Sequence, residues 1–181
     1  MARIIMHIDV NSAYLSWEAA YRLQHGASED LRDIPSVVGG DEESRHGIVL
    51  AKSGPAKKYG IKTGETLFSA RQKCPRLVVV PTNYYLYMQC HKALLEILRD
   101  FSPNVQVFSI DEAFIDYTGM ERIYGDPVNA AHTLKERIKK ELGFTVNIGI
   151  AKNKLLAKMA GELQKPDMVH TVLSEEEMKE K

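Results

Sequence analysis

VFSIDEAFI, residues Val107 to Ile115, is the stretch that decides how the chain folds. Two adjacent acids, Asp111 and Glu112, interrupt two apolar runs that are typical of buried β-strands. We therefore predict strands over 104–110 and 112–117. The short connection between them makes the two strands antiparallel neighbours, with the acids in the turn.

Strand and helix signals alternate on both sides of this hairpin. They predict a strand over 3–9, a helix from the Asn83 cap through Arg99, a helix from Asp126-Pro127 to Gly143 and a strand over 145–151. Without residues 11–81, the order is strand, helix, strand, strand, helix, strand. That is the split βαβ order of a ferredoxin-like α+β fold.

Residues 11–81 then form an inserted small α/β subdomain. Asn11-Ser12 is expected to cap a helix that runs to about Gln24. The remaining signals predict short strands at 36–38, 47–51 and 77–80, and short helices at 55–59 and 66–73. Near the end of the chain we expect a helix over 152–163, a strand over 169–172 and a helix capped by Ser174 that has barely begun at Lys181.

Composition excludes several classes of protein. Of the 181 residues, 44% are hydrophobic and 27% charged, so the chain is neither disordered nor fibrous. Basic and acidic residues number 24 each, which argues against a strongly electrostatic nucleic-acid binder, although lysines gather at 51–62 and 152–158. No apolar run could span a membrane, and two cysteines form no disulfide scaffold. We expect a cytoplasmic protein with no membrane partner.

Three acids are expected to converge at one edge of the predicted sheet. Asp9 ends the first strand, and Asp111 and Glu112 form the turn between the next two, which lies at the same edge in a split βαβ unit. Two carboxylates about 4 Å apart repel by about 4 kcal/mol at a partly buried site. Magnesium prefers such oxygen ligands. The alternative is an ordinary polar turn, with Asp9 as a helix-capping acid.

Four segments resemble, in order along the chain, motifs of the Y-family, or translesion, DNA polymerases of the UmuC/DinB group. HIDVNSAY (7–14) is similar to the first metal motif and SIDEAFID (109–116) to the SIDEA motif. GIAKNKLLAKMA (149–160) is similar to the stretch that supplies a phosphate-binding lysine, and KKYGI (57–61) to the fingers helix and its exit. The resemblance runs from residue 3 to about 172.

This resemblance implies a polymerase palm made of residues 1–12 and 82–173, with fingers inserted at 13–81. Residues 174–181 would begin a truncated linker or thumb. The thumb and little-finger domains of the family are absent from this sequence, so we expect the isolated chain to extend primers poorly or not at all. A sliding clamp is implied as a partner through a region beyond Lys181.

The resemblance also implies the residues of a site for two-metal nucleotidyl transfer. Two Mg²⁺ ions would be held by the carboxylates of Asp9, Asp111 and Glu112 and by the backbone carbonyl of Val10. A primer 3′-hydroxyl, on primer–template DNA, would attack the α-phosphate of a dNTP. The nucleotide-binding residues would be Asn11, Ser12 and Ala13 at a helix start, Lys57, Lys154, and Tyr14 as the steric gate under the sugar.

Some of these positions have alternative interpretations or depart from the family. Tyr14 suits a core aromatic of an amphipathic helix, and Lys154 suits a solvated helix lysine. The fingers helix often brings a tyrosine and an arginine to the triphosphate, whereas this chain has Gly54 and Lys57. Lysine lacks the bidentate fork of arginine, which bears on nucleotide affinity.

Three other functions compete with the polymerase. GGDEE (39–43) resembles the signature of diguanylate cyclases, but a turn between the strands at 36–38 and 47–51 explains it. A non-catalytic ferredoxin-like module could bind RNA through Phe108 and Phe114, although we expect both to pack in the core. The apolar face of the long helix is expected to be buried rather than to dock a partner; it comprises Met88, Cys90, Leu94, Leu95, Ile97 and Leu98.

Overall fold

A computed structural model describes residues 3–40, 47–172 and 174–180. The chain forms two compact units. The sheet unit comprises the residues up to Asn11 and those from Met88 onward, and the insertion unit comprises Ser12–Tyr87. The long helix α4 (Tyr84–Phe101) begins in the insertion unit and continues in the sheet unit. The division into palm and fingers stays a prediction.

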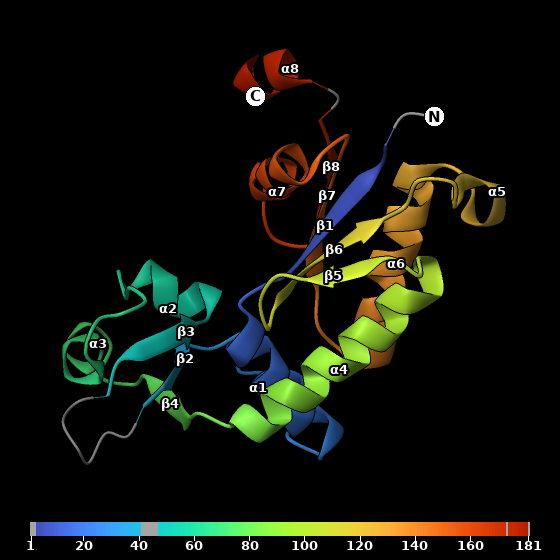
Figure 1. Ribbon diagram of the computed structural model, residues 1–181. Helices are drawn as coiled ribbons and strands as arrows, with labels where there is room; N and C mark the ends of the chain where they lie inside the picture. The colour runs from blue at the N-terminus through green and yellow to red at the C-terminus, as the bar shows by residue number, and fades with distance from the viewer. Residues whose placement is uncertain (1–2, 41–46, 173, 181) are drawn as a thin grey trace. The chain divides into compact units, whose positions relative to one another are not determined.

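The sheet unit contains a five-stranded sheet in the order β5-β6-β1-β7-β8 (Figure 1). Its strands are β1 (Ile5–Val10), β5 (Val105–Val107), β6 (Glu112–Asp116), β7 (Val146–Ala151) and β8 (Val169–Thr171). β6 pairs antiparallel with both β1 and β5, so β5 runs parallel to β1 with β6 between them. β7 pairs antiparallel with the other edge of β1, which completes the ferredoxin-like order and confirms the predicted fold class.

Four helices of the described residues lie wholly within this unit; two of them cover the faces of the sheet, and the two shorter ones pack beside these two. The four are α5 (Glu121–Tyr124), α6 (Pro127–Leu142), α7 (Lys154–Glu162) and α8 (Glu175–Glu180). Figure 1 shows α7 on one face and α6 on the other. α7 approaches β7 closely at Gly149, where an added Cβ would lie 2.0 Å from the backbone oxygen of Ala157. The sequence did not predict α5, which is only one turn long.

Two local signals differ from expectation. β5 ends at Val107 rather than residue 110 because the backbone N–H groups of Phe108 and Ser109 both donate to the carbonyl of Glu112, which bends the chain out of the ladder. The expected side-chain cap at the start of α1 (Ala13–Gln24) is absent: Ser12 has φ +47° and no capping hydrogen bond. Caps at Asp126 and Asn153 form as hydrogen bonds to the following turn.

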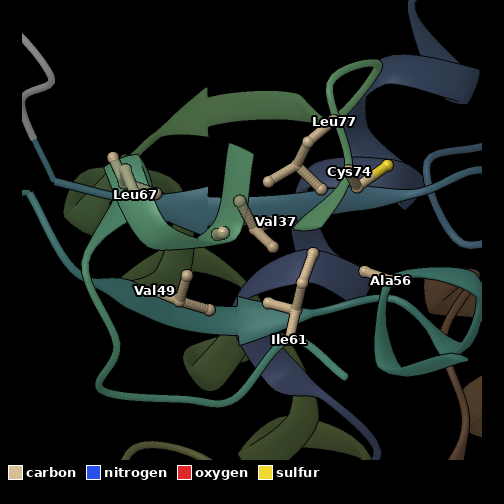
Figure 2. Close-up of a cluster of buried hydrophobic side chains, with 8 residues drawn as sticks. Val37, Val49, Ala56, Ile61, Leu67, Cys74 and Leu77 are labelled. Atoms are coloured by element: carbon tan, nitrogen blue, oxygen red, sulfur yellow. The ribbon is translucent and has the colours of Figure 1, made fainter. Parts of the chain in front are cut away.

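The insertion unit has its own three-stranded sheet in the order β3-β2-β4. Its elements besides α1 are β2 (Ser36–Gly39), β3 (Val49–Lys52), α2 (Gly54–Lys58), α3 (Leu67–Lys73) and β4 (Val78–Pro81). β2 pairs antiparallel with β3 and parallel with β4. Figure 2 shows its core, where side chains from both β-strands and helices meet: Val37, Val49, Ala56, Ile61, Leu67, Cys74 and Leu77.

Some interpretations fall partly outside the described residues. Asp41, Glu42 and Glu43 of the GGDEE segment lie there, but β2 and β3 on either side of it pair antiparallel, as a turn between two strands requires. Residue 173 at the predicted palm boundary and residue 181 also lie outside. Among the helices of the described ranges, none is both long and apolar enough to cross a membrane.

Candidate active site

The sheet unit brings two of the three predicted carboxylates face to face. Asp9 on β1 and Glu112 on β6 are direct cross-strand partners. Asp111 lies beside them in the chain, and its backbone carbonyl accepts a hydrogen bond of 3.0 Å from the N–H of Val10. The topology therefore joins residues that are about one hundred positions apart, as the hairpin argument requires.

Lysines from the α7 side neutralise both facing carboxylates. Asp9 is 7% exposed and forms an ion pair with Lys165, which also pairs with Glu162 at 2.8 Å. Glu112 pairs with Lys158 of α7 and lies 3.3 Å from Nε2 of the buried His7. The Asp111 carboxylate instead accepts a hydrogen bond of 2.7 Å from the hydroxyl of Ser109.

The environments of these carboxylates shift their pKa values in opposite directions. Burial raises the pKa of Asp9, and the hydrogen bond and charge of Lys165 only partly oppose it. Partial burial would also raise the pKa of Glu112, but hydrogen bonds from Lys158 and His7 outweigh burial and lower it. Burial lowers the pKa of His7, although its contact with Glu112 opposes this. Of Asp9 and Glu112, Asp9 is thus the carboxylate whose charged form is disfavoured, so an added cation would stabilise it.

The donor set fits magnesium in its chemistry. It consists of carboxylate oxygens on neighbouring strands and a turn, which are the hard ligands that Mg²⁺ prefers. Lys165 and Lys158 now provide the positive charge that the two carboxylates require. Within the described part of the chain, no three acidic, histidine or cysteine side chains lie close enough to enclose a metal ion. Ion binding would therefore require the carboxylates to turn away from their lysines.

Sequence reasoning missed Lys165, Lys158 and His7. His7 lies in HIDVNSAY (7–14) and Lys158 in GIAKNKLLAKMA (149–160), so the resemblance of these two segments to family motifs is the signal that could have indicated them. Lys165 is 156 positions from Asp9 and belongs to none of the four segments, so no local signal marks it. Lys154, predicted to meet a triphosphate, instead donates to the side chain of Gln106 on β5. Its proposed role stays a prediction.

Asn11, another predicted nucleotide residue, is half-buried at the end of the first segment of the sheet unit, and the remaining ones belong to the insertion unit. Tyr14 of α1 is half-buried and stacks on Tyr87 with 4.5 Å between ring centroids. The hydroxyl of Tyr87 donates to the buried carboxylate of Glu18 at 3.1 Å. Lys57 is exposed on α2, which begins at Gly54 after the Ser53 cap. Ser12 is exposed, and Ala13 is buried at the start of α1.

Two expectations about apolar side chains need correction. Phe114 is buried as expected, but Phe108 is 58% exposed because it lies beyond the end of β5 in the bend before the turn. The ammonium of Lys158 lies 4.8 Å from the centre of its ring. On α4, Leu94, Leu95, Ile97 and Leu98 are buried, but Met88 is exposed.

The chain is similar in sequence to a family of known proteins. The model of the impB/mucB/samB family matches residues 8–162. A protein named DNA polymerase IV from Clostridium acetobutylicum is 52% identical over 180 residues, which is 97% of this chain and 44% of that protein. A protein from Acetivibrio thermocellus that is also named DNA polymerase IV is 44% identical over 181 residues, which is 100% of this chain and 44% of that protein. The chain thus spans less than half of the curated relatives it matches.

Solved structures agree with the sequence relatives. A structure described as DinB from Sulfolobus solfataricus superimposes with a TM-score of 0.81 at 26% identity, covering 96% of this chain and 49% of that one. A post-insertion binary complex of Dbh DNA polymerase gives 0.82 at 25% identity, covering 98% and 50%. The resemblance to Y-family polymerases and the α+β fold are confirmed.

Proposed function

The chain belongs to the impB/mucB/samB family, and we propose that it carries the nucleotidyl-transfer site of a DNA-directed DNA polymerase of the translesion type. One observation supports this above the others. The buried Asp9 lies opposite Glu112 at the end of a ferredoxin-like sheet, with Asp111 next to it in the turn. The names of the relatives, DNA polymerase IV, agree with that chemistry.

Asp9, Asp111 and Glu112, with the backbone carbonyl of Val10, would hold two Mg²⁺ ions. The chemistry that bound Mg²⁺ supplies is stabilisation of negative charge on the attacking and leaving oxygens of the phosphoryl transfer. The carboxylates concentrate negative charge where β1 ends, and burial of Asp9 makes an added cation favourable there. In the proposed transfer, the primer 3′-hydroxyl would form the new bond to the α-phosphate of the dNTP, and pyrophosphate would leave.

Lysine side chains would bind the triphosphate. Lys165 contacts Asp9 directly, so its ammonium is available to phosphate oxygens once Asp9 is engaged by a metal ion. Lys57 and Lys154 are proposed as additional cations, as the family resemblance implies. Because lysine acts as a point charge, these contacts would add affinity with little directional selection.

The start of α1 would complete the nucleotide site. The N–H groups of Asn11, Ser12 and Ala13 are proposed to face the triphosphate, since a helix N-terminus favours an anion. Tyr14 would form the steric gate against a ribose 2′-hydroxyl. Its stacking on Tyr87, which is itself hydrogen-bonded to Glu18, gives the ring a fixed neighbour within the insertion unit.

The partners proposed are primer–template DNA, dNTP and a sliding clamp reached through a region outside this chain. The proposed role is synthesis across damaged template bases during DNA repair. A structure titled as an insertion ternary complex of Dbh DNA polymerase supports the choice of substrates. A cytoplasmic location and poor activity of the isolated 181 residues stay predictions.

The test is primer extension by the full-length protein opposite an intact and an abasic template. Extension is expected for the parent and should be lost when Asp111→Ala and Glu112→Ala are combined. The matched control is Asp116→Asn at the other end of β6, where the carboxylate pairs with the exposed Arg3; it should extend normally. If folded parent protein binds DNA but never extends a primer, the chain is a non-catalytic relative and the proposal is wrong.

A further inference from the structure

The buried side chain of Asn147 fixes the segment that carries Lys165. Asn147 lies on β7 and is fully buried. Its Nδ2 donates to the backbone carbonyls of Gly161 at 2.9 Å and Gln164 at 2.7 Å. Its Oδ1 accepts from the N–H of Met168 at 3.2 Å. One amide therefore binds both ends of the connection between α7 and β8, residues 163–168.

Asn11 extends this network to the same connection. Its Nδ2 donates to Oδ1 of Asn147 at 3.1 Å, so the Asn147 amide uses both donors and both acceptor positions. Oδ1 of Asn11 accepts from the Thr145 hydroxyl at 2.9 Å and from the N–H of Asp167 at 3.0 Å. Buried polar groups that are all satisfied in this way favour one arrangement of the backbone.

The network lies directly beside the candidate active site. Asn147 is the cross-strand partner of Asp9 on the edge of β1 opposite to Glu112. Lys165, in the connection that the amides hold, forms its ion pair with that same Asp9. We propose that Asn147, assisted by Asn11, is a positioning residue that holds Lys165 at the carboxylate of Asp9. Its effect on catalysis rests on the proposed polymerase function.

A second set of contacts also anchors the connection. The Asp167 carboxylate pairs with Lys135 at 2.8 Å and with Lys139 at 2.9 Å, both on α6. The amide network differs because it is buried and binds backbone groups on both sides of Lys165. An experiment must therefore separate the two anchors.

Asn147→Asp tests the network with almost no change of shape. An aspartate keeps the acceptor but cannot donate to Gly161 and Gln164 when ionised. The matched control is Asn153→Asp, because Asn153 only accepts a hydrogen bond as the α7 cap and aspartate caps equally well. Lys139→Met removes one of the α6 contacts. Thr145→Val, which deletes only the donor to Asn11, is the milder second variant.

The first measurement is amine acylation of the full-length protein, followed by mass spectrometry. Lys165 is expected to be acylated faster in Asn147→Asp, and to a lesser degree in Thr145→Val, with unchanged rates at Lys154. Amide hydrogen exchange should accelerate over 163–168 but not over 154–160. Unchanged rates in both variants, or an equal effect of Lys139→Met, would overturn the proposal. These readouts do not require polymerase activity.

The second measurement links the network to catalysis. Asn147→Asp should raise the KM for dNTP by about 10-fold or more, the size expected when Lys165 loses one charge-assisted contact to the triphosphate. In a Lys165→Ala background the same substitution should change KM less than twofold, because its effect acts through Lys165. Equal effects in both backgrounds would contradict the proposal. If Asn147→Asp fails to fold, the same comparison of KM with and without Lys165→Ala is made with Thr145→Val, and its result decides whether the proposal holds. A parent without activity would refute the proposed function alone.

Discussion

The two units bury polar side chains in different ways. In the sheet unit, the central strands bury His7, Asp9 and Asn147, and their partners lie more than ten residues away along the chain. In the insertion unit, the cluster shown in Figure 2 is apolar, and the buried polar side chains, which include Ser36, Ser53 and Glu18, lie outside that cluster.

This difference indicates how stability and function are divided within the chain. Burial of a charge or an amide is costly unless its partners are in place, so the sheet unit tolerates such groups for a reason other than stability. The apolar cluster of the insertion unit, in contrast, stabilises the fold by hydrophobic burial. The sheet unit should therefore lose function before stability, and the insertion unit should lose stability first.

Asp9→Asn should produce the largest functional effect. If Asp9 is a metal ligand, as proposed, primer extension by the full-length protein should fall by more than about a hundredfold, since loss of a direct ligand should exceed loss of a supporting partner. Stability should hold or rise, because burial disfavours the Asp9 charge and Lys165 retains Glu162. Steady-state kinetics and chemical denaturation measure the two effects. A variant that unfolds instead would remove the contrast between the units.

Ile61→Ala tests the expectation that the insertion unit loses stability first. Ile61 is 1% exposed in the apolar cluster, so its truncation should cost about 2–5 kcal/mol of unfolding free energy. Urea denaturation followed by the fluorescence of Trp17, the one tryptophan in the sequence, reports on the same unit. Ile48→Ala is the control, since Ile48 is 41% exposed and should change stability by less than about 0.5 kcal/mol. Equal costs would show that the cluster is loosely packed.

Gly149→Ala probes how closely the sheet unit is packed. The new Cβ would lie 2.0 Å from the Ala157 carbonyl and 2.4 Å from the Gly161 nitrogen, so α7 must move. We expect a loss of about 1–3 kcal/mol, measured by hydrogen exchange of the α7 amides. Gly54→Ala in the insertion unit meets no atom within 4 Å and should stay within about 0.5 kcal/mol. Normal exchange in Gly149→Ala would mean that α7 shifts at little cost.

Glu18→Gln should have the smallest effect, visible as a change in pH dependence. Burial raises the pKa of Glu18 above its ordinary 4.5, although Tyr87 and Arg22 oppose the shift. Below pH 4.5 the Glu18 carboxyl group is protonated in both the folded and the unfolded protein. As the pH rises above 4.5, the unfolded protein loses this proton first, whereas the folded protein keeps it until its raised pKa is passed. Stability therefore falls with pH. The neutral glutamine removes that fall, so the variant should gain stability relative to the parent as the pH rises above 4.5.

Glu65→Gln provides a control of opposite sign in the same unit. The hydrogen bond from Lys73 lowers the pKa of Glu65, so this carboxylate stabilises the fold above pH 4.5, and its contribution is lost as pH falls. The variant should lose stability near pH 7 and match the parent at low pH. Trp17 fluorescence in denaturant, recorded across pH, measures both variants. Parallel profiles for the two would contradict the assigned shifts.

Much of the fold followed from local patterns. The split βαβ order, the helix boundaries at Asp126 and Gly143, and the acidic turn at 111–112 were readable because capping, turn residues and strand periodicity act over a few positions. The same topology predicts that Asp9 lies near Glu112, and the two residues are direct cross-strand partners in the structure. The exposure of Phe108 was not readable, because it depends on a bend in the β5–β6 connection that the apolar pattern does not encode.

The sequence by itself determined the sheet, its insertion and the convergence of Asp9, Asp111 and Glu112 at one edge of the sheet. Each of these depends on short-range signals and on the split βαβ topology. Only the tertiary structure decided which cations meet those acids. Lys165 reaches Asp9 because the amides of Asn147 and Asn11 hold the connection at Gln164, 17 positions from Asn147, and at Asp167, 156 positions from Asn11. Such contacts depend on the packing of β7 against α7, where Gly149 allows the two elements to approach closely. No sequence pattern within the segment 163–168 predicts them.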